Sequence, residues 1–295
     1  MSRTHISRRG ILKLGSAAAA TACTAGVIRL ANAPAMADDQ QPADAEIPIG
    51  VQLYSVRGEC KKDFPGVLTQ LAEMGYQGVE FAGYYGRSGE ELRKLLDDNG
   101  LKCCGTHTGL NSLLPDKLNE TIEFNQEFGN KYLIVPSLGG KLRSVDSIKE
   151  TADQFNEIAE KVEPHGMVCG FHAHGGDFRK VEGDITRWEM FFDNTDPAVA
   201  MQLDVGNCLR GGGDPYAILK KYPGRSLTVH LKEHGGERGA PVGEGEVDWQ
   251  RVFELCETIG GTKWYIVEQE RYQEGGPMAT VRACLENIRK MRNQG

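Results

Sequence analysis

The sequence lacks an uninterrupted apolar segment long enough to span a membrane. Its weakly apolar run from Leu14 to Ile28 is followed directly by Arg29, whereas a spanning helix needs about 20 apolar residues. The chain of 295 residues is 40% hydrophobic and 25% charged, which is ordinary for a globular protein. A polytopic membrane protein, a collagen-like chain and a mainly disordered chain are therefore excluded.

The sequence also lacks an excess of positive charge beyond its first residues. Residues 1–37 carry five basic side chains and no acidic one, so the remaining chain has a formal charge of −12. Phosphate binding requires clustered lysine and arginine, and no nucleic-acid partner is therefore expected. The same deficit leaves no polybasic surface for anionic lipid, so we expect no membrane partner once residues 1–37 are removed.

Two common cofactor signatures are missing. The sequence has no Cys-x-x-Cys pair, and most of the cysteines after residue 37 lie in apolar runs typical of buried thiols. A bridge can form between them in an oxidising compartment, but their irregular spacing assigns none. No Gly-x-Gly-x-x-Gly follows the first predicted strand, which disfavours a dinucleotide-binding fold.

The first 37 residues have the features of a targeting segment. The stretch SRRGILK (7–13) closely resembles the twin-arginine export motif, an Ala-rich run follows, and Ala35-Met36-Ala37 fits a signal-peptidase site. The alternative is a disordered basic tail. We expect a twin-arginine signal peptide at 1–37, a polar linker at 38–48 and one domain at 49–295, so that the mature protein is periplasmic or extracellular. The twin-arginine route exports folded proteins, which suits a protein that acquires a metal before it crosses the membrane.

Short β-rich runs recur along the rest of the chain, and most are continuously apolar, as in parallel strands covered on both faces. They are 49–54, 76–81, 101–107, 131–136, 167–172, 199–204, 226–232 and 263–268. Between them, apolar residues repeat at helical spacing, as Phe64, Val67, Leu68 and Leu71 do before Gly75. Eight strand–helix units in about 250 residues predict an α/β fold, a single (β/α)₈ TIM barrel, with a doubly wound open sheet as the alternative.

Polar side chains end the fifth to the eighth predicted strands. His172, Asp204, His230 and Glu268 each lie at or near the end of an apolar run, and the carboxyl ends of barrel strands meet at one rim. A buried charge is costly there unless it is paired or binds a metal. Imidazole with carboxylate suits a transition metal better than Ca²⁺. We therefore predict that these four side chains hold one divalent metal ion (Mn²⁺, Co²⁺, Zn²⁺ or Mg²⁺), with satisfied core histidines as the alternative.

Eight short segments, in this order, resemble the xylose isomerase-like TIM barrels, also known as the sugar phosphate isomerase/epimerase or AP-endonuclease-2-like superfamily. They are GVQLYSVR (50–57), GYQGVEFAGYYG (75–86), GTHTGL (105–110), FHAHGGDF (171–178), LDVGN (203–207), VHLKE (229–233), VGEGEVDW (242–249) and YIVEQE (265–270). The resemblance extends over about residues 49–292. It implies a barrel enzyme that processes a carbohydrate with a divalent metal.

The resemblance also implies a ligand set and one departure from it. The family typically places its metal between a Glu, an Asp, a His and a second Glu, and Asp204, His230 and Glu268 match the last three. His172 stands where many epimerases of the family have the first Glu, and a branch of the superfamily shares this His-x-His. Because those epimerases use two facing glutamates as acid and base, that pair is incomplete in this chain.

Further polar residues at the strand ends are candidates for chemistry. The catalytic candidates are Glu268, His174, His107 and Lys232, and the substrate-binding candidates are Tyr54, Glu80 and Asn207. The resemblance suggests that Glu80 and His107 face the substrate. A base must take the proton next to a carbonyl, and a glutamate or histidine of this set can do so. Lys232 can neutralise an oxyanion or pair with an acid, Asn207 can hold Asp204 or a hydroxyl, and Tyr54 can line the pocket or pack.

We expect a metal-dependent isomerase or epimerase that acts on a keto-sugar or keto-glycoside through an enediolate. We expect no phosphate on the sugar, because the chain is acidic and no Gly-rich loop with a basic pair stands out. A lyase or dehydratase with the same metal site is one alternative, and a non-catalytic periplasmic sugar-binding protein is another. A nuclease would need more histidines and a basic groove. The expected partner is a small carbohydrate, and a homo-oligomer is left open.

Overall fold

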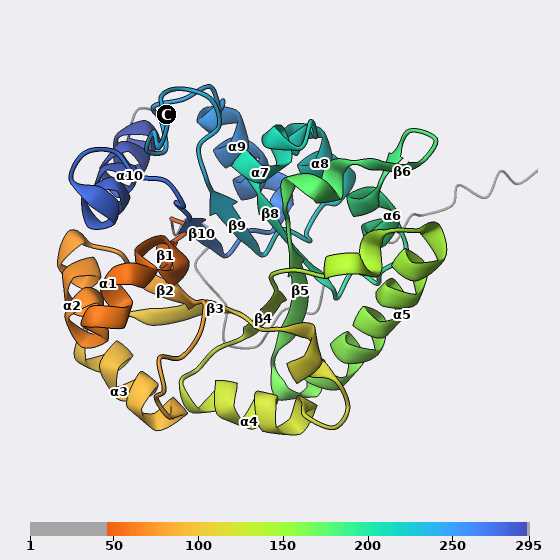
Figure 1. Ribbon diagram of the computed structural model, residues 1–295, viewed down its shortest axis with the longest axis horizontal. Coiled ribbons are helices and arrows are strands. Elements are labelled where there is room, and N and C mark those ends of the chain that lie inside the picture. The colour runs from red at the N-terminus through yellow and green to blue at the C-terminus, as the bar shows by residue number, and fades with distance from the viewer. Residues whose placement is uncertain (1–45, 294–295) are drawn as a thin grey trace, which may run out of the picture. The chain divides into compact units, whose positions relative to one another are not determined.

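The eight apolar runs of the sequence form parallel strands that close into a barrel surrounded by helices (Figure 1). In this computed structural model, which describes residues 46–293, the barrel strands are β1 (Ile49–Gln52), β2 (Gly78–Phe81), β3 (Lys102–His107), β4 (Tyr132–Val135), β5 (Val168–His172), β8 (Ala200–Asp204), β9 (Thr228–Leu231) and β10 (Trp264–Val267). Around the barrel they follow the order β1-β10-β9-β8-β5-β4-β3-β2. The predicted TIM barrel is confirmed, and the open sheet is wrong.

The predicted signal peptide, residues 1–37, lies outside the described residues, as does most of the predicted linker. The last residues of that linker belong to the barrel. Ile47 is buried, and its carbonyl oxygen accepts a hydrogen bond of 2.8 Å from Arg292 near the other end of the chain. The folded domain therefore starts a few residues before the expected position 49.

Helices cover the outside of the barrel, and the longer ones bury several apolar side chains each. They are α1 (Arg57–Lys62), α2 (Phe64–Met74), α3 (Gly89–Asp98), α4 (Leu118–Glu127), α5 (Val145–Val162), α6 (Arg187–Asp193), α7 (Val205–Arg210), α8 (Pro215–Lys221), α9 (Trp249–Leu255) and α10 (Gly276–Arg292). Local residues define the ends of two of them, including the predicted end at Gly75. A capping box of Ser88 with Glu91 begins α3, and Gly75 with a left-handed backbone follows α2. None of the helices in residues 46–293 combines the length and hydropathy of a membrane span.

A small hairpin between β5 and α6 is not predicted by the sequence. It pairs β6 (Lys180–Glu182) with β7 (Ile185–Thr186) in antiparallel fashion and lies outside the ring of barrel strands (Figure 1). Its strands are only three and two residues long, and β6 contains Lys180 and Glu182, so they lack the continuous apolar run of the barrel strands.

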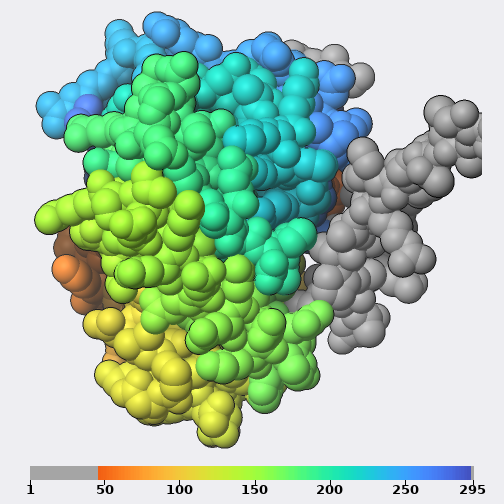
Figure 2. All heavy atoms as spheres, turned by 90° about the vertical axis from the view of Figure 1, so that its right-hand side faces the viewer, coloured from red at the N-terminus to blue at the C-terminus, as the bar shows by residue number. Residues whose placement is uncertain are grey.

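On the side turned to the viewer in Figure 2, the green to cyan part of the chain forms a continuous outer layer.

The pairing of β2 with β3 contains a β-bulge that affects the inside of the barrel. Val79 lies opposite Cys103, but Glu80 lies opposite Gly105, so one residue of β3 is extra. Gly105 has a φ of +156°, and a Cβ atom built on it would lie only 2.6 Å from Oε1 of Glu80. Glycine is therefore required at this position, because it leaves room for the buried Glu80 carboxylate.

The seven cysteines of the described chain are all free thiols. All except Cys103 are buried, which confirms the expectation drawn from their apolar surroundings. Burial raises the pKa of the Cys60 thiol to about 11 and of the Cys169 thiol to about 12. Buried, protonated thiols of this kind are unreactive.

Candidate metal centre

Four side chains from four neighbouring strands meet inside the carboxyl end of the barrel. His172 ends β5, Asp204 ends β8, His230 lies on β9, and Glu268 follows β10. All four are buried, and each offers one ligand atom within 4.8 Å of the others. Ligand atoms on opposite sides of one ion lie about 4 Å apart, so small side-chain shifts bring this set around a single cation. Two imidazoles with two carboxylates also form a donor set suited to a divalent transition metal.

The strand register explains why these side chains meet. Asp204 lies directly opposite His230 in the pairing of β8 with β9. The carboxylate of Asp204 is also fixed by the helix that follows, because its Oδ1 accepts a hydrogen bond of 2.7 Å from the backbone N–H of Asn207 at the start of α7. Asp204 therefore ends a strand and caps a helix at once, which holds its second oxygen toward the centre of the barrel.

His230 lies between two carboxylates. Its Nδ1 is 2.8 Å from Oε2 of Glu268, and its Nε2 is 2.7 Å from Oε2 of Glu80. Burial alone would lower the pKa of His230, but the charges and hydrogen bonds of the two glutamates raise it to about 10. In the metal-free protein His230 is therefore a cation at neutral pH.

Lys232 brings a second positive charge to the same oxygens. Its Nζ lies 3.2 Å from Asp204, 3.5 Å from Glu268 and 3.2 Å from Glu270. Burial opposes its charge, but these three carboxylates raise the pKa of Lys232 above its ordinary value. Of the expected roles, pairing with acids is the one visible in the structure. The carboxylate of the adjacent Glu233 accepts from backbone N–H groups and from Trp249.

The remaining ligand candidates differ in protonation. Burial and the charge of His230 lower the pKa of His172 well below its usual range, so this imidazole is neutral and has a lone pair to offer. Burial would raise the pKa of Glu268, but Lys232 and His230 hold it well below its ordinary value. Burial raises the pKa of Asp204 to about 6 despite the charge of Lys232. An ionised Glu268, a neutral His172 and a readily ionised Asp204 are therefore available to coordinate a cation.

Glu80 does not take the place expected from the sequence. Instead of facing a substrate, its side chain has no exposed surface and both its oxygens are occupied. Oε2 accepts hydrogen bonds from Gln52 at 2.6 Å and from His230, and Oε1 accepts one of 2.7 Å from Gln202. The β-bulge at Gly105 makes room for this carboxylate below the cluster, where it accepts a hydrogen bond from His230.

The two further histidines with predicted catalytic roles lie beside the cluster. His107 is mostly buried, and its ring is stacked on that of His230 with centroids 5.5 Å apart. His174 is exposed at the rim, and its ring centroid lies 4.8 Å from that of His172. Burial and the charge of Lys232 lower the pKa of His174, although Glu268 opposes this change. His174 is thus a neutral base candidate within reach of solvent and of the site.

Two predicted substrate-binding residues have different surroundings. Tyr54 lies beyond β1, in the short helix η1 (Leu53–Val56), where the residue is 41% exposed and the Arg57 guanidinium lies 4.1 Å from the ring centre. Asn207 is buried, and its Nδ2 donates to Asp204 at 2.8 Å and to the carbonyl oxygen of Ala173 at 3.1 Å. Asn207 therefore holds the aspartate, and Tyr54 forms part of the exposed rim.

Gln202 is a residue of the site that the sequence interpretation missed. It is fully buried on β8, two residues before Asp204, and hydrogen bonds connect it to residues of four other strands. The signal in the sequence is one polar residue inside the apolar run Val-Ala-Met-Gln-Leu. Because side chains alternate along a strand, a residue at this position shares the inward face with Asp204.

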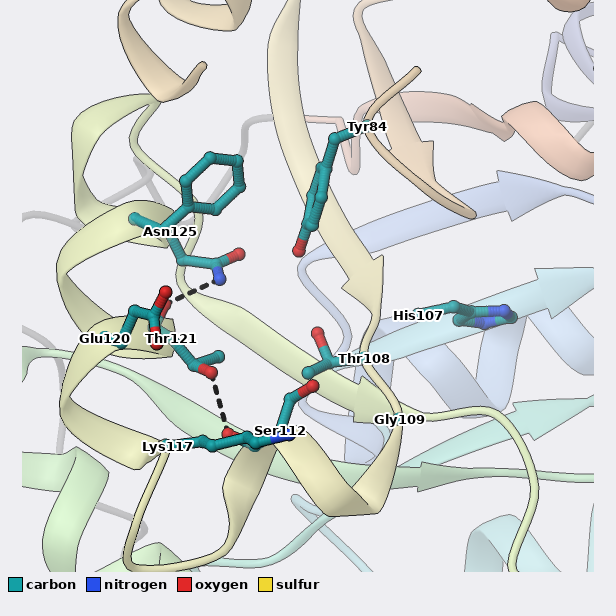
Figure 3. A pocket seen from close by; sticks show the side chains of 10 residues that line it. Tyr84, His107, Thr108, Gly109, Ser112, Lys117, Glu120, Thr121 and Asn125 are labelled. Atoms are coloured by element: carbon teal, nitrogen blue, oxygen red, sulfur yellow. Dashed lines mark hydrogen bonds between the residues drawn. The ribbon is translucent and has the colours of Figure 1, made fainter. Parts of the chain in front are cut away.

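Two cavities lie near the carboxyl ends of the strands. One of about 460 Å³ is bordered by Tyr84, Thr108, Thr121 and Asn125, and Figure 3 shows that the His107 side chain points away from these residues. His107 nevertheless also lines this cavity, and its ring is stacked on that of His230, so this histidine adjoins both the cavity and the candidate metal centre. The second, of about 270 Å³, adjoins the metal centre through Lys232. Its charged lining residues other than histidine are Arg210, Lys232, Arg238, Arg271, Glu233, Glu237 and Glu270.

Comparisons with known proteins agree on the type of barrel. A family model described as xylose isomerase-like TIM barrel matches residues 68–292. The chain is also similar to the inosose dehydratase of Geobacillus kaustophilus. The two are 26% identical over 247 residues, which cover 70% of this chain and 79% of that protein.

Solved structures give the same result. A sugar phosphate isomerase/epimerase from Parabacteroides distasonis is 25% identical and superposes with a TM-score of 0.71, covering 85% of this chain and 96% of that one. The IOLI protein, whose structure is described with a bound zinc atom, has a TM-score of 0.62 at 16% identity, covering 82% of this chain and 96% of that one. The second likeness concerns the fold alone.

Proposed function

The chain belongs to the xylose isomerase-like TIM barrel family, and from that premise we propose that it is a metal-dependent lyase or dehydratase acting on a keto-sugar or a related keto-polyol. The observation that carries the proposal is the buried set of His172, Asp204, His230 and Glu268 around one point of the barrel. The similarity to an inosose dehydratase supports elimination of water as the reaction.

His172, Asp204, His230 and Glu268 would hold the divalent metal. When bound, such an ion would draw electrons from a substrate carbonyl and make the neighbouring C–H more acidic. Glu268 suits the role of ligand better than that of base, because a carboxyl with a strongly lowered pKa is a weak base. Lys232 stays protonated and keeps a positive charge beside the carbonyl oxygen, where negative charge develops.

His174 is the residue that we assign to proton transfer. It is neutral, exposed at the rim and next to His172. A ring nitrogen of His174 takes the proton from the carbon next to the carbonyl, a C=C bond forms, and the C–O bond on the following carbon breaks. The departing hydroxyl leaves as water with the proton that His174 gives back. One base is sufficient for this sequence.

The absence of a paired glutamate favours elimination over epimerisation. His172 occupies the position of the first family Glu, and Glu80 is engaged on both oxygens below the cluster. Two opposed glutamates, as an acid and base pair, are therefore not found around this cluster in the described chain. Isomerisation remains the second candidate, because it begins with the same proton abstraction and the Parabacteroides distasonis relative has that name.

The cavity beside Lys232 supports an unphosphorylated substrate. It is lined by four lysine or arginine residues and three glutamates, so its charges nearly cancel. A phosphate dianion is favoured by a clear excess of positive charge. We therefore propose a neutral keto-sugar, keto-glycoside or keto-polyol.

The test is NMR in deuterated water with the Mn²⁺-loaded protein and a panel of keto-sugars and inososes. We expect an unsaturated ketone or its dione product to appear, and expect His174→Asn to lower this rate by about 10²–10⁴-fold. Glu268→Gln should lose both the metal and the activity. His165→Asn is the matched control, because this exposed histidine precedes β5 at the opposite end of the barrel.

The possible outcomes separate the candidates. Deuterium in an otherwise intact sugar would favour the isomerase, and turnover only of phosphorylated substrates would contradict the proposed substrate class. Full metal loading with tight sugar binding, but neither exchange nor elimination across the panel, would contradict an enzyme and favour a binding protein.

A further inference from the structure

Gln202 makes four hydrogen bonds from a fully buried position below the metal centre. Its Oε1 lies 3.0 Å from Nε2 of His107 and 3.0 Å from Nδ1 of His172. Its Nε2 donates to Oε1 of Glu80 at 2.7 Å and to Oγ1 of Thr228 at 2.9 Å. Every hydrogen-bonding direction of the amide is therefore used.

The surroundings determine which way this amide points. Glu80 is an ionised carboxylate that already accepts hydrogen bonds from Gln52 and His230, so it can only accept from Gln202. The NH₂ group of Gln202 must therefore face Glu80, and the carbonyl oxygen must face the two histidines. Rotating the amide by 180° would place the carbonyl oxygen against the carboxylate and the NH₂ group against the imidazoles.

A carbonyl oxygen only accepts hydrogen bonds, so the facing nitrogens of both histidines must carry hydrogen. We propose that Gln202 is a positioning residue that holds His172 in its Nδ1–H form and thereby leaves the Nε2 lone pair free for the metal. This Nε2 is the nitrogen directed at the cluster, 3.6 Å from Oε2 of Glu268. The inference rests on the metal site of the proposed function, but concerns a property of the metal-free protein.

The same amide connects both imidazole ligands to one support. Gln202 contacts His172 directly, and it contacts Glu80, which binds Nε2 of His230. A carboxylate or carbonyl that accepts from the far N–H of a ligand histidine orients the ring, and its loss typically costs about 10–100-fold in metal affinity. An apolar side chain of the same size would fill the space but would leave Glu80, His107 and His172 without this partner.

The test uses long-range ¹H–¹⁵N NMR on histidine-labelled, metal-free protein at pH 8, where His172 is neutral, with its signals assigned through His172→Asn. We expect His172 to show the Nδ1–H pattern in the wild type. Gln202→Met should shift it toward the Nε2–H form and lower Zn²⁺ affinity by about 10–100-fold. Gln202→Glu keeps an acceptor for both histidines, and one proton on the oxygen that faces Glu80 preserves a donor to that carboxylate. This variant should therefore retain the Nδ1–H form.

Gln77→Met is the control, because Gln77 precedes β2 at the opposite end of the barrel and its side chain accepts from the backbone N–H of Ile49, away from every ligand candidate. It should change neither the histidine signals nor the Zn²⁺ affinity. An Nε2–H form of His172 in the wild type would overturn the proposal, and so would a folded Gln202→Met protein with unchanged signals and affinity. If Gln202→Met does not fold, the wild-type spectrum and Gln202→Glu decide. A protein without the proposed activity should still show the Nδ1–H form of His172. Failure of the proposed function and failure of this inference can therefore be told apart.

Discussion

At the residue scale, the candidate metal centre pairs its buried charges with one another. The carboxylates of Glu80, Asp204 and Glu268 face the cations of His230 and Lys232 within hydrogen-bond or ion-pair distance. Buried charges are tolerated only in such arrangements, because an unpaired one costs several kcal/mol. A metal ion must therefore compete with a proton on His230 and with the ammonium group of Lys232 for the same oxygens.

The first prediction concerns the proton on His230. The pKa of His230 in the folded protein is about 10, above its ordinary value of 6.5. Without metal, the protonated ring therefore contributes its full share of the unfolding free energy below pH 6.5, and this share is lost as the pH rises through about 10. Because metal binding must remove this proton, Mn²⁺ affinity should rise by about tenfold per pH unit between pH 7 and 9. Calorimetry in buffers of different ionisation enthalpy should detect the release of about one proton. A constant affinity over this range would contradict the role of His230, and His165→Asn should retain the slope.

The second prediction concerns Lys232. In Lys232→Met the metal-free protein should lose about 3–5 kcal/mol of unfolding free energy, because Asp204 and Glu268 lose a buried partner. The same variant should bind Mn²⁺ more tightly than the wild type, because no ammonium group then competes for these oxygens. Denaturant unfolding and calorimetry measure the two effects. Lys221→Met is the control, since Lys221 forms a partly exposed ion pair with Asp193 worth about 0–1 kcal/mol. Weaker metal binding in Lys232→Met would contradict the competition.

At the element scale, the barrel strands were predictable because apolar runs of this length identify parallel strands directly. Each predicted run contains its strand, and the ends differ by no more than two residues. The hairpin of β6 and β7 and the β-bulge of β3 were not predictable. The hairpin has no apolar alternation, and the bulge depends on how β2 and β3 pair, which no local pattern encodes.

The residues of the candidate site were predictable from the sequence, but the hydrogen bonds that hold them were not. Asp204, His230 and Glu268 are charged groups at or near the ends of apolar runs, and such positions attract notice in any sequence. The structure brings them together with His172 as the sequence suggested, while their role as ligands stays a prediction. The hydrogen bonds of Glu80 to Gln202 and His230 join residues 122 and 150 positions apart. These hydrogen bonds depend on how the barrel strands are aligned with one another, and this alignment is known only from the three-dimensional structure.

The third prediction tests the β-bulge. Gly105→Ala should lower the unfolding free energy by about 1–3 kcal/mol, because a Cβ atom 2.6 Å from Glu80 must displace a carboxylate held by three hydrogen bonds. Metal affinity should fall with it, since Glu80 orients His230. Gly58→Ala is the control: Gly58 lies in α1 with free space around it, so this change should be neutral or slightly stabilising. Equal stabilities of the two variants would contradict the role of Gly105.

At the scale of the whole molecule, the metal should stabilise the barrel by joining four strands. At a metal concentration of about 100 times Kd, binding adds about 2.7 kcal/mol, which corresponds to a Tm increase of about 5–10 °C for a domain of this size. Thermal unfolding with EDTA and with Mn²⁺, Co²⁺, Zn²⁺ or Mg²⁺ should show this increase for at least one metal. Asp204→Asn should abolish it. An unchanged Tm with all four metals would contradict a metal site.

We propose that residues 1–37 direct export by the twin-arginine route. In Arg8→Lys with Arg9→Lys the full-length chain should stay in the cytoplasm, whereas the wild type should be recovered outside it, starting after Ala37. Cell fractionation with mass spectrometry of the N-terminus distinguishes these results. Arg3→Lys lies outside the motif and should be exported normally. Export of the double variant would contradict the proposal.

Under the proposed export, the unbridged cysteines of the described chain favour folding before transport. An unfolded chain that reached an oxidising environment would offer its sulfur atoms to wrong pairings, which would trap it away from the barrel. Inside the finished barrel, six of the seven sulfur atoms are shielded from oxidants by the strands and helices around them. The chain is therefore safe in such an environment only when folding comes first and transport second, and the packing around its cysteines protects it there as long as the barrel stays closed.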